Sequence, residues 1–147
     1  MLSKRDALYS LIDSTQADIV LLTETWLTPE IHDSEVFPSC MNFNLYRCDR
    51  MCKRGGGVLI AVNNRLTVSR VTTAPGLEMV WLYISSHSFQ TVIGLCYRPP
   101  DSNNAFVPLL QECLSEISLK FHKATLILLG DFNYPSIDWN RLEVNSK

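Results

Sequence analysis

The amino-acid sequence predicts an α/β or α+β layered sandwich. Short apolar runs, each followed by polar residues, alternate with two segments of helical periodicity. The strand-like runs between these two segments follow one another through short connections, which favours antiparallel pairing. The expected order is therefore a helix, a strand, several antiparallel strands, a second helix and a last strand. Such an order buries the apolar face of each helix against a sheet.

The first helix is expected over residues 2–14. Ser3 can cap it, and Asp6 lies in its first turn, where a negative charge is favoured. Its apolar face is formed by Leu8, Leu11 and Ile12.

Strands are predicted wherever apolar residues run together or alternate with polar ones. They are Ile19–Thr23, Asn44–Asp49, Val58–Val62, Leu66–Val71, Met79–Ile84, Thr91–Tyr97 and Thr125–Leu129. Three of these are read as buried strands, namely Ile19–Thr23, Val58–Val62 and Thr125–Leu129. Met79–Ile84 and Thr91–Tyr97 are read as the two strands of a hairpin.

The remaining segments are a second helix and two connections. Asn103 or Asn104 can cap the helix. Its apolar positions keep helical spacing and are Phe106, Leu109, Leu110, Cys113, Leu114, Ile117 and Phe121. Residues 26–43 form a long connection that has room for a short helix. Three consecutive glycines, 55–57, predict a turn in which the backbone adopts positive φ and approaches its neighbours closely.

Size and composition are those of one ordinary globular domain. The chain has 147 residues, of which 46% are hydrophobic and 19% charged. The net charge of −2 provides no general attraction for nucleic acid, so DNA binding would need a local patch. The apolar runs are far shorter than the roughly 20 residues of a membrane span. The charged amino terminus is unlike a secretory signal, so we expect an intracellular protein without a membrane partner.

Cysteines and basic residues give weaker signals. The cysteines are odd in number and lack the spacing of a zinc site, so we expect reduced thiols. The basic cluster is Arg47, Arg50, Lys53 and Arg54. It is interpreted as a solvated loop slightly in preference to a nucleic-acid patch.

Two apolar strands end on acidic residues, and these ends carry the functional prediction. Glu24 follows the first strand, while Asp131 and Asn133 follow the last. Ligands of open α/β sheets gather at the carboxyl ends of strands, so we expect the two carboxylates at one rim. Such oxygen donors suit Mg²⁺. Alone, each motif is more simply an exposed acid or a turn.

A third polar strand end strengthens this interpretation. Tyr97 and Arg98 lie beside the rigid pair Pro99-Pro100. A tyrosine hydroxyl can donate a hydrogen bond to a phosphate oxygen, and a guanidinium can hold phosphate bidentately. Arg98 is therefore a candidate phosphate-binding residue. The alternative for Tyr97 is an aromatic side chain that packs on the sheet.

These motifs together resemble the endonuclease/exonuclease/phosphatase superfamily. They are Leu22-Thr23-Glu24-Thr25-Trp26-Leu27, Gly55-Gly56-Gly57-Val58, Tyr97-Arg98-Pro99-Pro100 and Gly130-Asp131-Phe132-Asn133-Tyr134-Pro135. The branch that they resemble most is the apurinic-endonuclease-like domain of non-LTR retrotransposons. The resemblance extends over residues 8–139. It implies an α/β/β/α four-layer sandwich, present here in part, with mixed and largely antiparallel sheets.

The resemblance also implies roles for individual residues. Glu24 matches the metal-binding glutamate, and Asp131 matches an aspartate that engages the attacking water and the metal. Asn133 and Tyr97 match residues that contact the phosphate. The implied cofactor is Mg²⁺ or Mn²⁺, and the implied reaction is hydrolysis of a DNA phosphodiester. DNA is then the partner of a full domain and the nucleus its location. No protein partner can be inferred.

The sequence departs from the family pattern at both ends. The family begins with a strand that ends in asparagine, and it continues to a carboxy-terminal Ser-Asp-His whose histidine is the general base. Here His32, His87 and His122 are all expected at the surface. Loss of a general base costs about 10²–10⁴-fold in rate. We therefore expect residues 1–147 to be one incomplete domain that is weakly active or inactive and prone to aggregate.

Two alternatives stay open. The first is a phosphatase or phosphodiesterase of the same superfamily, which would differ in its substrate. The second is a non-catalytic remnant or interaction module, which need not bind metal.

Overall fold

The structure, a computed structural model, describes residues 1–51, 54–72, 76–86, 88–135, 137–138, 140–141 and 143–144. The helices are α1 (Arg5–Thr15), α2 (Asp33–Val36) and α3 (Phe106–Lys120), with 3-10 turns η1 (Leu2–Lys4) and η2 (Ser39–Met41). The strands are β1 (Ile19–Thr23), β2 (Phe43–Cys48), β3 (Val58–Asn63), β4 (Val68–Val71), β5 (Glu78–Ser85), β6 (Gln90–Tyr97), β7 (Thr125–Asp131), β8 (Ile137–Asp138) and β9 (Glu143–Val144).

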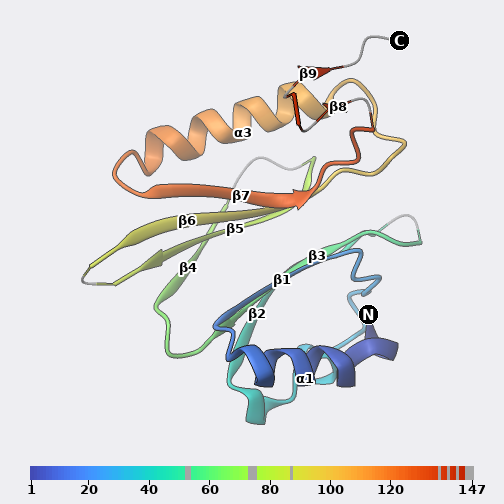
Figure 1. The fold of residues 1–147 in the computed structure, drawn as a ribbon, viewed down its shortest axis with the longest axis vertical. Coiled ribbons are helices and arrows are strands. Elements are labelled where there is room, and N and C mark those ends of the chain that lie inside the picture. The colour runs from blue at the N-terminus through green and yellow to red at the C-terminus, as the bar shows by residue number, and fades with distance from the viewer. Residues whose placement is uncertain are drawn as a thin grey trace.

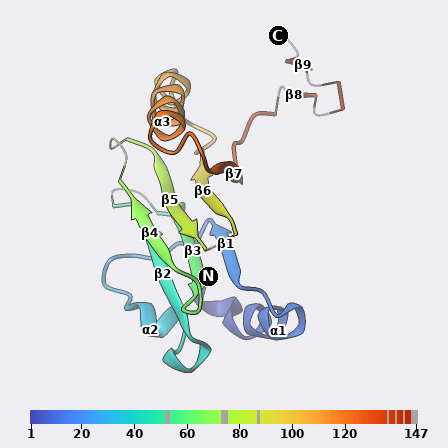
Figure 2. The ribbon, with the colours of Figure 1, turned by 90° about the vertical axis from the view of Figure 1, so that its left-hand side faces the viewer.

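Most strands belong to two sheets. The first sheet has the order β1-β3-β2, and both of its pairings are antiparallel. The second has the order β4-β5-β6-β7, in which only β7 runs parallel to its neighbour. The short strands β8 and β9 pair with each other and stand apart from both sheets (Figure 2). Because β6 and β7 are parallel, they end at the same edge of their sheet.

The two sheets pack face to face, and one long helix covers the outer face of each (Figure 1). Side chains of β3, β5 and β6 fill the space between the sheets. α1 packs on the first sheet through Ile12, which contacts the cluster of Leu59 and Ala61. α3 packs on the second sheet, where Cys113 and Ile117 join Trp81. These layers confirm the expected mixed α/β sandwich. No helix in the described ranges has the length and apolar character needed to cross a membrane.

The starts of both long helices differ from the expectation. Ser3 lies inside η1, so Lys4 rather than Ser3 is the N-cap of α1. Asn103 accepts the backbone N–H of Ala105 at 3.0 Å in the turn before α3, and Ala105 is the N-cap. The expected face of α1 is also narrower than predicted, because Leu11 is 58% exposed. Leu11 lies at the border of the face that positions 8 and 12 share.

The connection between β3 and β4 passes from the first sheet to the second, which the sequence did not predict. β3 and β4 are consecutive and closely spaced, yet they belong to different sheets. β3 already has β1 on one edge and β2 on the other, so it offers no free edge to β4. The expected hairpin of β5 and β6 is confirmed.

β7 is exposed, and the prediction that it is a buried strand is wrong. Leu126 and Ile127 are each 38% exposed, and Leu129 is 44% exposed. β7 is the outer strand of its sheet and pairs only with β6. α3 shields one side of it, where Leu128 joins the apolar cluster beneath the helix. An unbroken apolar run was therefore a correct signal for a strand but not for its burial.

Candidate active site

The polar ends of β1, β6 and β7 meet at one rim of the sandwich. Glu24 directly follows β1, and Tyr97 and Asp131 are the last residues of β6 and β7. Tyr97 and Asp131 are register partners across the two parallel strands. The Tyr97 hydroxyl donates a hydrogen bond to the Glu24 carboxylate in the facing sheet. The fold thus brings together the side chains whose strand-end positions were noticed in the sequence.

Glu24 is held by several hydrogen-bond donors. Its Oε2 accepts the backbone N–H of Gly56 at 2.9 Å and the indole N–H of Trp26 at 2.6 Å. With the hydroxyl of Tyr97, the carboxylate receives three donors. A carboxylate offers about four lone-pair positions, so one direction remains for a cation.

These contacts keep Glu24 ionised. Burial raises the pKa of its carboxyl group, but the hydrogen bonds from Tyr97, Gly56 and Trp26, together with the charge of Arg50, outweigh burial and lower the pKa overall. An ionised carboxylate is the form that binds a cation.

Tyr97 is 3% exposed, and its hydroxyl stays protonated at neutral pH. Burial, and then the hydrogen bond to Glu24 and its negative charge, raise the pKa of Tyr97 to about 12. The group therefore remains a hydrogen-bond donor at neutral and mildly alkaline pH.

Gly55, Gly56 and Gly57 form the loop whose backbone binds the Glu24 carboxylate. All three have positive φ, between 73° and 88°. A Cβ atom on Gly56 would lie 2.4 Å from Cζ of Arg50, and one on Gly57 would lie 2.7 Å from Oγ1 of Thr25. Only glycine brings the backbone N–H of residue 56 within reach of the carboxylate, which confirms the expected close approach.

Arg50 and Glu78 fasten this glycine loop to β5. Arg50 Nε donates to Glu78 Oε1 at 2.6 Å, and the backbone N–H of Gly57 donates to Glu78 Oε2 at 2.8 Å. The two side chains are only 16% and 18% exposed. The guanidinium also lies over the ring of Tyr97, with Cζ 5.5 Å from the centroid.

The expectation of a solvated basic loop is wrong for the two arginines that precede the loop. Arg47 is 12% exposed and pairs with Asp33 at 2.8 Å and Asp49 at 2.5 Å. Arg50 is paired as described above. Acidic residues that are distant in the sequence, Asp33 and Glu78, draw both guanidinium groups into the fold. Arg54 is exposed, and Lys53 lies outside the described residues.

Reciprocal hydrogen bonds join the segments that follow β6 and β7. Arg98 Nη1 donates to the Asn133 carbonyl, and Asn133 Nδ2 donates to the Arg98 carbonyl, both at 2.8 Å. The backbone N–H of Asn133 donates to Oδ1 of Asp131 at 3.1 Å. Asn133 thereby orients Asp131, and among the described residues its second amide hydrogen and its Oδ1 have no partner.

Arg98 is engaged within the fold. Its Cζ lies 4.1 Å from the ring centroid of Tyr134 and 5.6 Å from that of Phe106. Its contact with phosphate stays a prediction, and its observed contacts are those of a residue that positions the loop after β7.

Left-handed backbone is concentrated at this rim. Among the described residues, five that are not glycine have positive φ, and Glu24, Trp26 and Asn133 are three of them. The other two, Gln16 and Asn42, are ordinary helix C-caps. Such conformations cost of order 1–3 kcal/mol each and cluster at functional sites.

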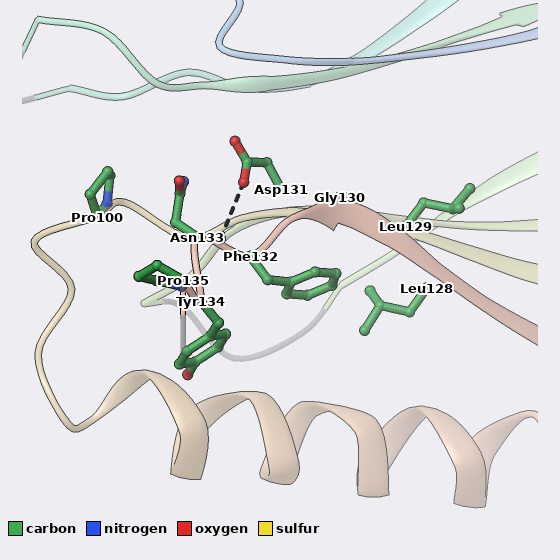
Figure 3. Close-up of a pocket in the computed structure, with 9 residues that line it drawn as sticks. All are labelled: Pro100, Leu128, Leu129, Gly130, Asp131, Phe132, Asn133, Tyr134 and Pro135. Atoms are coloured by element: carbon green, nitrogen blue, oxygen red, sulfur yellow. Dashed lines mark hydrogen bonds between the residues drawn. The ribbon is translucent and has the colours of Figure 1, made fainter. Parts of the chain in front are cut away.

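Two hollows adjoin the site. An open cleft of about 680 Å³ lies beside residues 128–135 and Pro100. In Figure 3, Asp131 and Asn133 point toward the facing sheet, whereas Phe132 and Tyr134 point toward α3. A second hollow of about 500 Å³ lies between the start of α1 and the end of β1, and Glu24 and Trp26 line it. Asp131 thus lines the first hollow and Glu24 lines the second.

The donor set fits Mg²⁺ better than a metal that needs an enclosed protein cage. Within the described ranges, no group of three or more histidine, cysteine or acidic residues is arranged to hold a metal. Mg²⁺ is commonly bound through one or two carboxylates and keeps several waters. The ionised Glu24, with one open direction, and the exposed Asp131 meet that requirement.

The described histidines lie elsewhere. His32 is the N-cap of α2, and its backbone N–H donates to Glu35 at 2.9 Å. His122 follows α3, at the opposite end of β7 from Asp131. Both are exposed, as expected, and His87 lies outside the described residues.

Comparison with known sequences decides the family. A sequence model of the Endonuclease/Exonuclease/phosphatase family matches residues 1–146. The chain belongs to this family. Members of the Endonuclease/Exonuclease/phosphatase family are hydrolytic phosphodiesterases and nucleases, and they generally use divalent metal ions. No curated protein matches the sequence.

Solved structures share the fold of this family member. The endonuclease domain of TRAS1, a telomere-specific non-LTR retrotransposon, has a TM-score of 0.65 and 19% identity, and the match covers 92% of this chain and 55% of that one. The catalytic domain of human Nocturnin has a TM-score of 0.63 and 12% identity, with 90% and 57% covered. ANGEL2, a 2′,3′-cyclic phosphatase, has a TM-score of 0.65 and 18% identity, with 90% and 44% covered. The chain spans about half the length of these structures.

The sequence did not single out Trp26, Arg50 and Glu78 as parts of the site. Glu78 stands alone before an apolar strand, and nothing in its spacing connects it to the glycine loop. Trp26 and Arg50 lie beside motifs that were noticed, and proximity to those motifs was the only available signal.

Proposed function

We propose that this family member is a Mg²⁺-dependent endonuclease domain of retrotransposon origin that hydrolyses DNA phosphodiesters. The observation that carries the proposal is the convergence of Glu24, Tyr97 and Asp131 from two facing sheets. Similarity to the TRAS1 endonuclease domain supports this branch of the family. We propose Glu24 and Asp131 as the residues that hold Mg²⁺ or Mn²⁺. DNA is the proposed partner and the nucleus the proposed location.

Each side chain has a distinct task in this proposal. When bound, the cation supplies positive charge to a phosphoryl oxygen and to the leaving oxygen. Tyr97 donates its hydrogen bond to Glu24 and fixes the direction of that carboxylate. Asp131 orients the attacking water and accepts its proton. Asn133 holds Asp131 through its backbone N–H and offers its free amide hydrogen to the developing charge on phosphate.

We also propose that the isolated chain cleaves slowly. His32 is the N-cap of α2 and His122 lies at the opposite end of β7 from Asp131, so among the described residues we assign no histidine as the general base. A carboxylate in that task is a weaker base than a histidine near neutral pH, and a positioned base typically contributes about 10²–10⁴-fold.

The test is nicking of supercoiled plasmid in the presence and absence of Mg²⁺. We expect slow, EDTA-sensitive nicking by the unaltered chain and a further loss of about 10²-fold or more with Glu24→Gln. Glu116→Gln, an exposed acid on α3, is the matched control and should retain the activity of the unaltered chain. Nicking that persists in EDTA, or that Glu24→Gln leaves unchanged, would contradict the metal assignment.

A phosphatase is the second candidate, because ANGEL2 matches this chain with the same TM-score as the TRAS1 domain. Release of inorganic phosphate from a 2′,3′-cyclic or terminal phosphate would favour it. We expect cleavage within a DNA strand to exceed such release. A titration calorimetry experiment with Mg²⁺ or Mn²⁺ separates both from a non-catalytic module, since Glu24→Gln should abolish the heat of binding.

A further inference from the structure

Trp26 lies exposed at the rim of the site, and packing within the fold does not explain this exposure. The residue is 53% exposed although it is the largest apolar side chain near the site. Its φ of +55° is rare for a bulky residue. The backbone N–H of Trp26 donates to the Gly56 carbonyl at 3.0 Å, and its indole N–H donates to Glu24 at 2.6 Å. These contacts hold the indole rigidly without burying it.

The guanidinium of Arg54 lies over this indole. Cζ of Arg54 lies 5.3 Å from the centre of the Trp26 ring, and Arg54 is itself exposed. An exposed aromatic face beside an exposed guanidinium is the combination with which proteins hold single-stranded nucleic acid, through base stacking and phosphate contacts. Glu24 touches the same indole, so a strand seated here passes directly over the proposed cation site.

We propose that Trp26 stacks on an unpaired nucleobase next to the phosphate being cleaved, and that Arg54 contacts the backbone of the same strand. Bases within an intact duplex have both faces covered by their neighbours, so the stacked base must be unpaired or turned out of the helix. The inference rests on the proposed function and narrows its substrate to DNA with an exposed base.

The structure also permits a simpler role, in which Trp26 only orients Glu24 through its N–H. Two substitutions separate the roles. Trp26→Phe keeps an aromatic ring but has no N–H for Glu24. Trp26→Gln keeps an N–H donor but has no aromatic face. Stacking predicts that the glutamine variant loses DNA binding and the phenylalanine variant retains it. Orientation of Glu24 predicts the reverse order for Mg²⁺ affinity, with no effect on DNA binding.

The binding assay uses two labelled probes in EDTA, so that no cleavage occurs. One is a short oligothymidylate, and the other is a strand of the same length made of abasic residues. Both carry the same phosphates, but only the first has bases. We expect the unaltered chain to bind oligothymidylate roughly tenfold more tightly, which is typical of one base–aromatic contact. Trp26→Gln should remove that difference.

Arg54→Gln provides the matched electrostatic variant. It should weaken binding of both probes equally and should lower the salt dependence by about one unit of slope, since one phosphate contact is lost. Circular dichroism establishes that each variant is folded. Trp26→Leu supplies a second variant without an aromatic ring if the glutamine variant is not folded.

The outcomes distinguish this inference from the proposed function. Equal binding of both probes by the unaltered chain, or an undiminished preference in the aromatic-free variant, overturns stacking even if plasmid is nicked. A preference that depends on Trp26, together with an absence of Mg²⁺-dependent cleavage, supports stacking and overturns the nuclease.

Discussion

The charge of Glu24 depends on residues from three separate parts of the chain. Tyr97 comes from the facing sheet, Gly56 from the glycine loop and Trp26 from the turn after β1. Each donates a hydrogen bond that stabilises the carboxylate over the protonated acid, which lowers its pKa. This stabilisation of the fold is present above the ordinary pKa of the carboxyl group. It is lost as the pH falls through the lowered pKa of the folded state.

Tyr97→Phe should move the acidic limb of the pH–rate profile to higher pH. Removal of the hydroxyl takes away a hydrogen bond that lowers the pKa of Glu24, so protonation of Glu24 begins at a higher pH. A hydrogen bond to a charged group is worth about 1.5–3 kcal/mol, so the acidic limb should move by about one pH unit or more. Plasmid nicking across a pH series measures this shift.

The alkaline side of the same profile provides the control. Because the pKa of Tyr97 is about 12, its ionisation does not limit activity between pH 7 and 10. An acidic limb that does not move in Tyr97→Phe would mean that the hydroxyl does not act on Glu24.

Individual site residues were predictable where a polar residue ends an apolar run. That rule identified Glu24, Tyr97 and Asp131, because a strand places its last residue at the rim whatever the rest of the fold does. It missed the left-handed backbone of residues 24 and 26, because glutamate and tryptophan carry no local preference for positive φ. The conformation is imposed by the glycine loop, which is distant in the sequence.

At the scale of elements, a buried ion pair ties the glycine loop to the second sheet. Glu78 accepts hydrogen bonds from Arg50 and from the backbone of Gly57, so one carboxylate joins the loop to the start of β5. The same guanidinium lies over Tyr97. The loop, the ion pair and the tyrosine therefore connect the two sheets beside the site.

Glu78→Gln should destabilise the fold by about 1–3 kcal/mol, because it leaves the mostly buried Arg50 without its charge partner. The free energy of unfolding in urea measures the loss. Arg65→Gln is the control, since it breaks an ion pair with Asp18 in which Arg65 is 63% exposed, and such pairs contribute about 0–1 kcal/mol. Equal losses in both variants would contradict a special role for the pair at the loop.

Gly130→Ala should be more damaging than its small size suggests. A Cβ atom at this position would lie 1.9 Å from the carbonyl oxygen of Cys96, and the φ of Gly130 is +152°. The obstacle is backbone, so the clash can be relieved only by parting β6 from β7 just before Asp131. We expect a loss of roughly 3 kcal/mol or more in thermal unfolding.

Thr125→Ala, at the exposed start of the same strand, is the matched control for Gly130→Ala. It should change stability by no more than about 1 kcal/mol. A Gly130→Ala variant with the stability of that control would show that β6 and β7 are not held together at this point.

Element types were predictable from periodicity, but apart from the hairpin of β5 and β6 the neighbours of each strand were not. The runs that became β1, β3 and β6 were recognised nearly to the residue. The separation of β3 from β4 depends on which strand edges are already occupied, which is a property of the assembled sheet. The exposure of β7 has the same origin, because burial depends on what lies beside a strand.

For the whole molecule, the outer strand β7 leaves an apolar edge in contact with water. Alternate residues of a strand share a face, so Ile127 and Leu129 lie on the same side as Asp131. Figure 3 shows Leu129 and Asp131 on the side of the ribbon away from α3, with Leu128 on the helix side. An exposed apolar edge strand can pair with the edge of another chain.

We therefore expect the chain to associate as its concentration rises, and Ile127→Lys combined with Leu129→Lys to suppress this association. Lysine on an edge strand opposes edge-to-edge pairing through charge repulsion and through the cost of burying an ammonium group. Sedimentation velocity over a concentration series measures the effect. Leu119→Lys is the control, because Leu119 is 80% exposed on α3 and belongs to no strand edge. If Leu119→Lys suppresses association as strongly as the double variant, general surface hydrophobicity rather than the edge of β7 drives the contact between chains.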